Sequence, residues 1–325
     1  MNPSIQIKAD ALLSNILWYH IGGKTKYLLV CQNKQDIVEA IAFIQEHAIT
    51  KVFVCGQGTN LIFTDEYFDG VVIQLVKSDI SMITLDREGV IEAFGGEVLG
   101  DIVKESLEQG LIGLEWAGGL PGTVGAGVRG NVGAYGKEVK DSVLSAEVLD
   151  FSGDAPAITV LSNRELQFIY RGSIVKSHKK MVVISARFGL TKGTEQEIAQ
   201  ATGIYQQRIL SRQKNHPLEY PNCGSVFKNL RDPLQIAKVL SVYPDFKEDV
   251  EKKWYGKVAV AALIDRWGLK GYRVGDAQIS EKHALFIVNL GHATANDVLQ
   301  LIDKVQEKCQ EEFGFQLALE VEVVA

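Results

Sequence analysis

The segment at residues 118–136, GGLPGTVGAGVRGNVGAYG, constrains the fold of this chain more than any other feature. Eight of its nineteen residues are glycine, and glycine weakens the interior of a helix or strand by about 0.5–1 kcal/mol per position. The segment is therefore predicted to form neither an ordinary helix nor an ordinary strand. A flexible linker is the alternative, but apolar residues are spaced through the run and serine is absent. We expect a ligand to lie against the backbone N–H groups of this segment.

A dinucleotide-binding interpretation arises because residues 125–130, GAGVRG, match the pattern GxGxxG and Asp150 follows. That pattern requires a strand leading in and a helix leading out. Here Gly119, Pro121 and Gly122 interrupt the approach, and further glycines interrupt the exit. The sequence thus predicts phosphate binding by a geometry other than the Rossmann turn.

A second phosphate-binding candidate is the turn GQGTNLIF at residues 56–63, which follows a predicted strand at 51–55. Its two glycines, Gly56 and Gly58, allow the backbone to approach an anion, and the threonine and asparagine that follow add hydrogen-bonding side chains. Leu61 stands where a Rossmann motif has its third glycine. An ordinary strand-to-helix turn explains the pattern equally well.

The composition describes a globular protein of about two domains. The 325 residues carry a formal net charge of −6 and contain no run of lysine and arginine. Neither a nucleic acid nor an anionic membrane surface is therefore expected as a partner. No apolar stretch approaches the roughly 18 residues that a membrane-spanning helix needs.

The four cysteines, Cys31, Cys55, Cys223 and Cys309, are far apart and form no CxxC pair. This spacing argues against a zinc site and, without a secretory leader, against a disulfide framework. We therefore expect no bound metal and a reducing, cytoplasmic environment.

Hydrophobic periodicity and turn residues predict a mixed α+β chain. The expected helices lie at residues 36–47, 99–109, 194–212, 256–267 and 296–313. Thr294 and Asp297 are placed to form a capping box for the last helix, and Gly314 is placed to end it. The expected strands lie at 51–55, 70–76, 81–94 (as a pair), 143–150, 156–160, 181–190, 284–290 and 315–324. Two prolines and an asparagine after Arg212 mark the start of a further unit.

Three polar residues in apolar or glycine-containing surroundings are the catalytic candidates. Arg171 follows an apolar stretch in FIYRGSIVK, although a solvated arginine at a helix end fits the same pattern. Ser225 follows a glycine in PNCGSVFKN, where a helix cap is an equally good interpretation. Glu320 lies in the last predicted strand, where alternation puts it on one face with Glu322, most simply the solvent face. No GxSxG motif or Ser/His/Asp order supports a hydrolase triad.

The longer motifs together carry a resemblance that no single pattern provides. In chain order they are IGG, GQGTNL, GLEWAGGLPGTVGAGVRGNVGAYG, YRGSIVK, PLEYPNCGSVFKN, LIDRWGLKGYRVGDAQISEKHALFIVN and LALEVEV. From Ile21 to Val324 the chain resembles the UDP-N-acetylenolpyruvoylglucosamine reductase family. The resemblance implies an α+β protein in which a two-part FAD-binding module of the vanillyl-alcohol-oxidase type precedes a C-terminal α+β substrate domain. The expected domains are FAD-binding subdomains at 1–77 and 78–213 and a substrate-binding domain at 214–325.

By this resemblance, NADPH reduces FAD, and reduced FAD delivers hydride to UDP-N-acetylenolpyruvoylglucosamine. The product is UDP-N-acetylmuramate, a precursor for peptidoglycan. Matching motifs assign Arg171 and Glu320 to the substrate carboxylate and Ser225 to proton donation. An arginine suits a carboxylate because of its planar fork, whereas Glu320 would have to carry or share a proton.

The resemblance also implies the binding residues. FAD is expected to be noncovalent, because the glycine-rich segment contains no histidine or cysteine to tether it. The residues expected to bind FAD are Gly56, Gly58, Thr59, Asn60, Leu61, Gly118, Gly119, Pro121, Gly122, Thr123, Gly125 and Ala126. Those expected to bind substrate are Tyr170, Lys228, Asn229 and His283. The short stretch between Arg171 and Ser225 resembles the family's compact form, which lacks a substrate-covering tyrosine loop.

Two other functions fit parts of this pattern. A flavin oxidase of the same fold would use oxygen and another substrate, but it would not need the set of Arg171, Ser225 and Glu320. A non-catalytic nucleotide-binding protein would keep the flavin fold without turnover, yet candidates stand at all three catalytic positions.

Overall fold

Two units, each with its own sheets and core, make up this computed structural model, which describes residues 5–86, 88–153 and 155–325. The first unit contains the described residues up to Ala11 together with Thr25–Gln57 and Tyr67–Arg212. The second unit contains Leu12–Lys24, Gly58–Glu66 and Gln213–Ala325. Each unit therefore draws on the N-terminal part of the chain.

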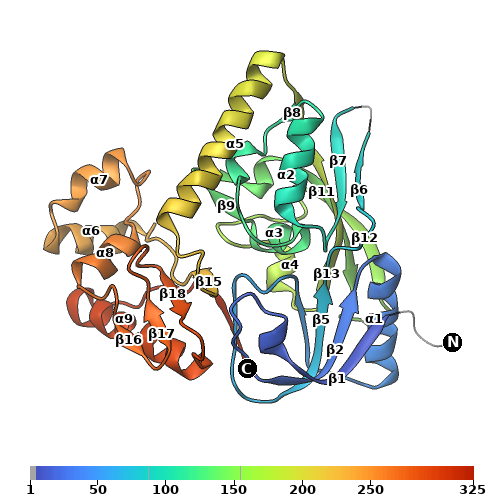
Figure 1. The fold of residues 1–325 in the computed structure, drawn as a ribbon, viewed down its shortest axis with the longest axis horizontal. Helices are drawn as coiled ribbons and strands as arrows, with labels where there is room; N and C mark the ends of the chain where they lie inside the picture. Colours follow the sequence, from blue (N-terminus) through green and yellow to red (C-terminus); the bar gives the residue numbers. More distant parts are fainter. Residues whose placement is uncertain (1–4, 87, 154) are drawn as a thin grey trace. The chain divides into compact units, whose positions relative to one another are not determined.

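The first sheet of the first unit has the strand order β1-β2-β5-β3, of which β1, β2 and β5 are labelled in Figure 1. Its strands are β1 (Gln6–Leu12), β2 (Lys24–Cys31), β3 (Val52–Cys55) and β5 (Phe68–Leu75). β5 pairs in parallel with both β2 and β3, and α1 (Lys34–Glu46) connects β2 to β3. The Asn33 side chain caps α1, which buries Ile37, Ile41 and Ile44 at helical spacing. The predicted helix and strands in this region are confirmed.

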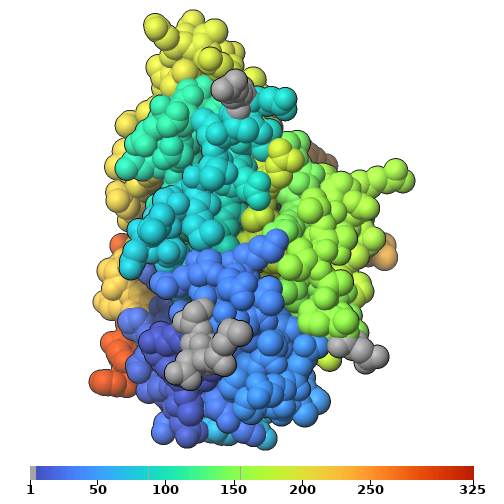
Figure 2. Space-filling view, turned by 90° about the vertical axis from the view of Figure 1, so that its right-hand side faces the viewer, coloured from blue at the N-terminus to red at the C-terminus, as the bar shows by residue number. Residues whose placement is uncertain are grey.

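The second sheet is antiparallel, with the order β12-β11-β13-β7-β6. Its strands are β6 (Ile83–Leu85), β7 (Val90–Phe94), β11 (Val143–Asp150), β12 (Ala157–Ser162) and β13 (Met181–Gly189). β13 is buried on both faces, because Val182 and Ile184 join the core of the first sheet while Val183 joins the opposite core. A register shift against β11 near Ile184 then puts Ala186 on the face of Val183. β12 is the exposed edge strand, among the green atoms at the right of Figure 2.

A short helix lies inside the glycine-rich segment, where none was predicted. This helix, α3 (Val124–Gly130), starts at Thr123, whose side chain accepts the Ala126 N–H, and ends at Asn131 with φ 44°. Val124 and Val128 are fully buried in a core that includes residues of β13. The prediction is wrong because packing of two valines one turn apart outweighs the poor helix propensity of the glycines.

The first unit contains several further helices, turns and short strand pairs. They are α2 (Leu99–Glu108), α4 (Ile174–Ser177), α5 (Glu195–Asn215), the 3-10 turns at Glu115–Ala117 and Val139–Asp141, and the strand pairs β8 (Leu111–Ile112) with β14 (Thr191–Lys192) and β9 (Gly133–Ala134) with β10 (Lys137–Glu138). The predicted helices at 99–109 and 194–212 correspond to α2 and α5.

The second unit is built on the antiparallel sheet β15-β18-β17-β16, with α9 lying along it (Figure 1). Its strands are β15 (Asn222–Ser225), β16 (Arg273–Val274), β17 (Ala277–Ile279) and β18 (Phe286–Asn289), and its helices are α6 (Pro233–Val242), α7 (Phe246–Lys252), α8 (Val260–Arg266) and α9 (Ala295–Phe313). β4 (Leu61–Phe63) pairs in parallel with β19 (Glu322–Val324).

An early segment of the chain, which includes the 3-10 turn at Leu13–Asn15, is fixed in the core of the second unit. Tyr19 is fully buried, and its hydroxyl donates to the Ile287 carbonyl at 2.9 Å. The Asn289 side chain donates in turn to the Tyr19 carbonyl at 3.2 Å. These hydrogen bonds join residues that are far apart in the sequence. Tertiary contacts, rather than local propensity, therefore place the early segment in the second unit.

Three expectations for this part of the chain differ from the structure. Helices α6 and α7 were not predicted, although Asp232 caps α6 and Pro233 occupies its first turn. The helix expected at 256–267 begins only at Val260. The strand expected at 315–324 is wrong except for β19, because the backbone before it bonds to other partners.

Hydrogen bonds from other parts of the second unit keep residues 317–320 from forming a regular strand. The Gln306 side chain accepts the Leu317 N–H and donates to the Leu317 carbonyl, both at 2.8 Å. The Ala318 carbonyl accepts the Lys228 N–H, also at 2.8 Å. Glu320 therefore lies outside a regular strand, and the expected alternation with Glu322 does not apply to it.

The capping box of α9 is confirmed: Thr294 accepts the Asp297 N–H at 3.1 Å and Asp297 accepts the Thr294 N–H at 2.9 Å. We expect Thr294→Ala to lower the free energy of unfolding by about 1 kcal/mol, because the first turn loses an acceptor. Urea unfolding followed by circular dichroism measures this loss. The exposed neighbour Asn296→Ala should change stability by less than about 0.5 kcal/mol, and an equal loss in both variants would contradict the capping role.

Candidate active site

Gly56 lies against the glycine-rich segment of the first unit at a distance that leaves no room for a side chain. A Cβ built on Gly56 would lie 2.4 Å from Thr123 Oγ1. Beside this contact, the Gly122 N–H donates to Gln57 Oε1 at 3.2 Å, and Gly122 has φ 110°. Such a φ favours glycine. The two predicted phosphate-binding turns are thus in contact here.

The turn at residues 57–60 is where the sequence predicts an anionic ligand. Within the described ranges, none of its four backbone N–H groups donates a hydrogen bond to another residue. Successive N–H groups in a turn of this kind bind phosphate oxygens. The turn connects β3 to β4, so the alternative of an ordinary strand-to-helix turn is wrong.

Several residues expected to bind the cofactor also have clear structural partners. The Val124 and Gly125 N–H groups donate to the Glu97 and Gly95 carbonyls at 2.9 and 2.8 Å. Gly118 and Gly119 lie against α5, while Pro121 and Ala126 are exposed. The cofactor role of these residues stays a prediction.

In the second unit, Asn60 holds the backbone next to Glu320 through two hydrogen bonds. Its side-chain nitrogen donates to the Glu320 carbonyl at 3.1 Å, and its own carbonyl accepts the Glu322 N–H at 3.1 Å. The neighbouring Thr59 carbonyl would lie 3.6 Å from a Cβ on Gly224. The predicted cofactor turn and a predicted catalytic residue therefore meet within this unit.

Ser225 lies beside Glu320 at the end of β15. The Glu320 N–H donates to the carbonyl of Val226, the residue after Ser225, at 2.8 Å. In the described part of the chain the Ser225 hydroxyl makes no hydrogen bond. The next helix begins at Pro233 with Asp232 as its cap, so the helix-cap interpretation of Ser225 is wrong.

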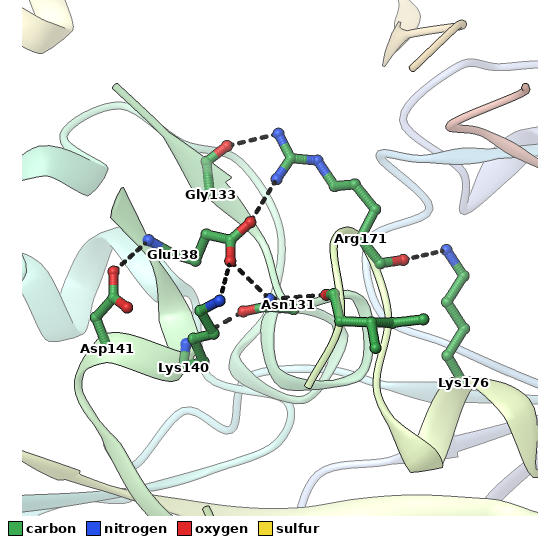
Figure 3. A network of polar contacts seen from close by, with 8 residues as sticks. Asn131, Gly133, Glu138, Lys140, Asp141, Arg171 and Lys176 are labelled. Atoms are coloured by element: carbon green, nitrogen blue, oxygen red, sulfur yellow. Dashed lines mark hydrogen bonds and ion pairs between the residues drawn. The ribbon is translucent and has the colours of Figure 1, made fainter. Parts of the chain in front are cut away.

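Arg171 belongs to the first unit and lies in the polar network of Figure 3. Its guanidinium donates to the Gly133 carbonyl at 2.8 Å and lies 4.0 Å from a Glu138 carboxylate oxygen. Glu138 also pairs with Lys140 at 2.9 Å and accepts from the Asn131 side chain at 3.1 Å. The Arg171 side chain is only 19% exposed, and the residue lies in the turn between Ile169 and Gly172, so the interpretation as a solvated arginine at a helix end is wrong.

The charge of Glu138 fixes the position of Arg171. Burial raises the pKa of Glu138, but hydrogen bonding and charge from Lys140, the Asn131 hydrogen bond and the Arg171 charge lower it more. Its pKa therefore lies below the ordinary 4.5, and the carboxylate stays ionised at neutral pH.

The Arg171 backbone has φ 60°, a value that bulky residues rarely adopt. A residue in this region costs about 1–3 kcal/mol and persists where its surroundings hold it. Here Lys176 donates to the Arg171 carbonyl at 3.1 Å, and Ile169 and Gly172 exchange two backbone hydrogen bonds across it. Strain of this kind is common at functional sites.

The expected substrate-binding residues are divided between the units. Tyr170 lies in the first unit, with the Arg171 guanidinium 4.9 Å from its ring centre. In the second unit, Asn229 Oδ1 accepts the Val260 N–H at 3.2 Å, and the Lys228 side chain is half-buried. The His283 ring accepts the Leu285 N–H at 3.3 Å and packs against His216.

Two residues with clear roles were not predicted. Gln57 stands between the two glycines of its turn, and that position is a usable sequence signal. Glu138 gave no signal, because its partner Arg171 is distant in the sequence and the contact exists only in the folded unit.

The cysteine nearest the cofactor turn is a poor nucleophile. Burial raises the pKa of Cys55 to about 12, and the charge of Arg129 lowers it only in part. All four cysteines are buried and free. Among the described residues, no cluster of three or more His, Cys, Asp or Glu could hold a metal ion. No described helix combines the length and the apolar character that crossing a membrane requires.

Comparison with known proteins matches both parts of the chain. Residues 25–156 match the profile of an FAD binding domain, and residues 216–324 match that of the UDP-N-acetylenolpyruvoylglucosamine reductase C-terminal domain. The UDP-N-acetylenolpyruvoylglucosamine reductase of Caldicellulosiruptor saccharolyticus is 36% identical over 99% of this chain and 93% of that protein. The protein of the same name from Enterococcus faecalis is 36% identical over 98% and 95%. The crystal structure of the Thermus caldophilus reductase aligns with a TM-score of 0.74 at 29% identity, covering 99% of this chain and all of that one.

Gly56→Ala should weaken FAD binding, because its Cβ would collide with Thr123. Overpacking of this kind costs about 1–3 kcal/mol, so we expect the affinity for FAD to fall by about ten- to a hundredfold. Reconstitution of the apoprotein, followed by flavin fluorescence, measures the dissociation constant. Gly130→Ala is the matched control, because a Cβ there would meet nothing within 4 Å. Equal affinity in both variants would show that the contact does not support the cofactor site.

We expect the flavin to be bound noncovalently, since the nearest cysteine is buried with a raised pKa and the glycine-rich segment offers no tether. Acid precipitation of the purified protein should leave all yellow colour in the supernatant. Flavin that stays with the pellet through a denaturing wash would refute this expectation.

Proposed function

The chain belongs to the UDP-N-acetylenolpyruvoylglucosamine reductase family, and we propose that Arg171, Ser225 and Glu320 carry out its reaction. It is an FAD-dependent oxidoreductase that uses NADPH and reduces the enolpyruvyl group of a UDP-sugar. One observation supports the assignment above the others. Asn60 of the cofactor turn bonds the backbone at Glu320, Glu320 bonds the carbonyl of Val226 next to Ser225, and Gly224 on the other side of Ser225 lies against Thr59.

The chemistry that FAD supplies when bound is transfer of hydride from NADPH to the terminal carbon of the enolpyruvyl double bond. The turn at residues 56–61 and the segment at 118–126 would hold it. Gly56 and Gly122 permit the close backbone approach, and the unbonded N–H groups of residues 57–60 would bind its diphosphate.

Ser225 is the proposed proton donor. Hydride addition leaves negative charge on the carbon next to the substrate carboxylate, and that carbon must receive a proton. The Ser225 hydroxyl is half-buried and has no hydrogen-bond partner among the described residues, so it is available to donate. The serine oxygen then recovers a proton from water.

Arg171 and Glu320 are proposed to stabilise the developing negative charge on the carboxylate. The planar Arg171 guanidinium suits a carboxylate and is oriented by Gly133 and Glu138. Glu320 would have to be protonated, or share a proton, to donate rather than repel. Removal of one such stabiliser commonly costs about 3–4 kcal/mol of transition-state binding.

The remaining assignments are part of the same proposal. Lys228 and Asn229, three and four residues after Ser225, would meet the substrate diphosphate or, in turn, the NADPH phosphates, with Tyr170 and His283 as further substrate contacts. We propose FAD-binding subdomains at 1–77 and 78–213, which contain the two main sheets of the first unit, and a substrate domain at 214–325, with which residues 12–24 and 58–66 also pack. Four free, buried cysteines suit a reducing cytoplasm.

Replacement of Ser225 by alanine should separate the two half-reactions. Reduction of the flavin by NADPH needs no proton from Ser225, so it should proceed at nearly the parent rate. Reoxidation by the enolpyruvyl substrate should slow by about 10²–10⁴, as expected for loss of a general acid. Anaerobic stopped-flow absorbance measures each phase separately.

The exposed Ser241 of α6 provides the control, since among the described residues its hydroxyl bonds only the Lys238 carbonyl of its own helix. Ser241→Ala should leave both phases unchanged. If Ser225→Ala is reoxidised as fast as the parent, another group donates the proton.

A further inference from the structure

Two arginines on α5 lie one helical turn apart against the glycine-rich segment of the first unit. A Cβ built on Gly118 would lie 3.2 Å from Arg208 Cβ, and one on Gly119 would lie 3.1 Å from Arg212 Cδ. The absence of side chains at these two glycines therefore lets the arginine stems lie directly on the segment.

Neither arginine has an anionic partner in the described part of the chain. The sequence contains 40 acidic residues, yet within the described ranges neither Arg208 nor Arg212 forms an ion pair or a hydrogen bond. The Nε atoms of both are buried without an acceptor. Burial of a charged donor without an acceptor is costly. Because the protein covers the two Nε atoms, an acceptor from outside the chain would bind the terminal nitrogens of these guanidiniums, which are not among the buried atoms.

Tyr135 orients Arg208 without using its donors. The guanidinium carbon lies 3.8 Å from the centre of the Tyr135 ring, a cation–π contact made by the face of the group. The N–H groups at the edge stay available. Tyr135 itself has φ 55°, so this contact is held by a backbone conformation that is rare for tyrosine.

We infer that Arg208 and Arg212 form a binding site for a phosphate group of a nucleotide. Arginine binds phosphate through paired N–H donors in a fixed plane, and two arginines one turn apart present such donors side by side. Burial lowers the pKa of Arg212, as expected for a cation still without its counter-charge. This inference rests on the proposed function only for its candidate ligands, which are FAD, NADPH and the UDP-sugar.

Glutamine variants of each arginine test the site, with Lys214→Gln as the control because Lys214 is exposed on the same helix. The flavin content of the purified proteins reports on FAD. Titration of the flavin-loaded enzyme with NADP⁺ and with UDP, followed by flavin absorbance, reports on the other two nucleotides. Charge-assisted hydrogen bonds of this kind predict a loss of about ten- to a hundredfold in affinity for one nucleotide.

The pattern of loss identifies the source of the phosphate. Loss of flavin assigns the site to FAD, and loss confined to NADP⁺ or to UDP assigns it to that ligand. If Arg208→Gln and Arg212→Gln bind all three within twofold of the parent, or if Lys214→Gln loses as much, the site does not exist.

Should the glutamine variants fail to fold, the lysine variants keep the charge but lose the paired donors. They are expected to lose affinity for the same single nucleotide by a smaller factor, and no loss overturns the inference. None of these titrations depends on turnover. If the parent protein proved inactive, the proposed function would be refuted, but nucleotide binding by the variants could still be compared.

Discussion

Close backbone packing between two glycine turns is the constraint on which the cofactor half of this protein depends. Gly56 approaches Thr123 where no side chain would fit, and the N–H groups of Val124 and Gly125 are bonded to the carbonyls of Glu97 and Gly95. The glycine-rich segment is therefore fixed on the connection between β7 and α2 rather than free in solvent. Near the start of α3 the amides of the segment are therefore bonded inward, whereas the amides of residues 57–60 have no partner among the described residues. Glycine is required here for proximity as much as for its dihedral freedom.

The second unit contains two early segments of the chain, which explains why its catalytic candidates adjoin residues 58–60 of the cofactor turn. Residues 12–24 are fixed through Tyr19 and Asn289, and residues 58–66 through the parallel pairing of β4 with β19. Because of that pairing, Asn60 meets the backbone at Glu320. The chain thus couples the turn that would hold phosphate to the residue that would polarise the substrate. Ser225 joins them through the Val226 carbonyl.

Strain and charge concentrate around the glycine-rich segment of the first unit. Asn131, Tyr135 and Arg171 all have positive φ without being glycine. Each is held by polar or ring contacts: Asn131 by Glu138, Arg171 by Gly133, and Tyr135 under the Arg208 guanidinium. Asn131 ends α3 in this conformation, whereas strain at residues such as Tyr135 and Arg171 is common at functional sites.

The sequence by itself determined the family, because long motifs in a fixed order are specific, and it determined most elements, because helical spacing and caps are local properties. The Thr294 capping box and Gly314 at the end of α9 are examples.

Tertiary structure alone decided what depends on distant contacts. The helix at 124–130 exists because two valines find a core, the strand expected at 315–321 is lost to bonds from Gln306 and Lys228, and Gln57 reaches Gly122 across 65 residues. The pairing of Arg171 with Glu138 and the unpartnered Arg208 and Arg212 belong to the same class. Local propensity contributes tenths of a kcal/mol per residue, whereas burial of an apolar side chain contributes about 1.5–3 kcal/mol, so packing overrides propensity wherever the two disagree.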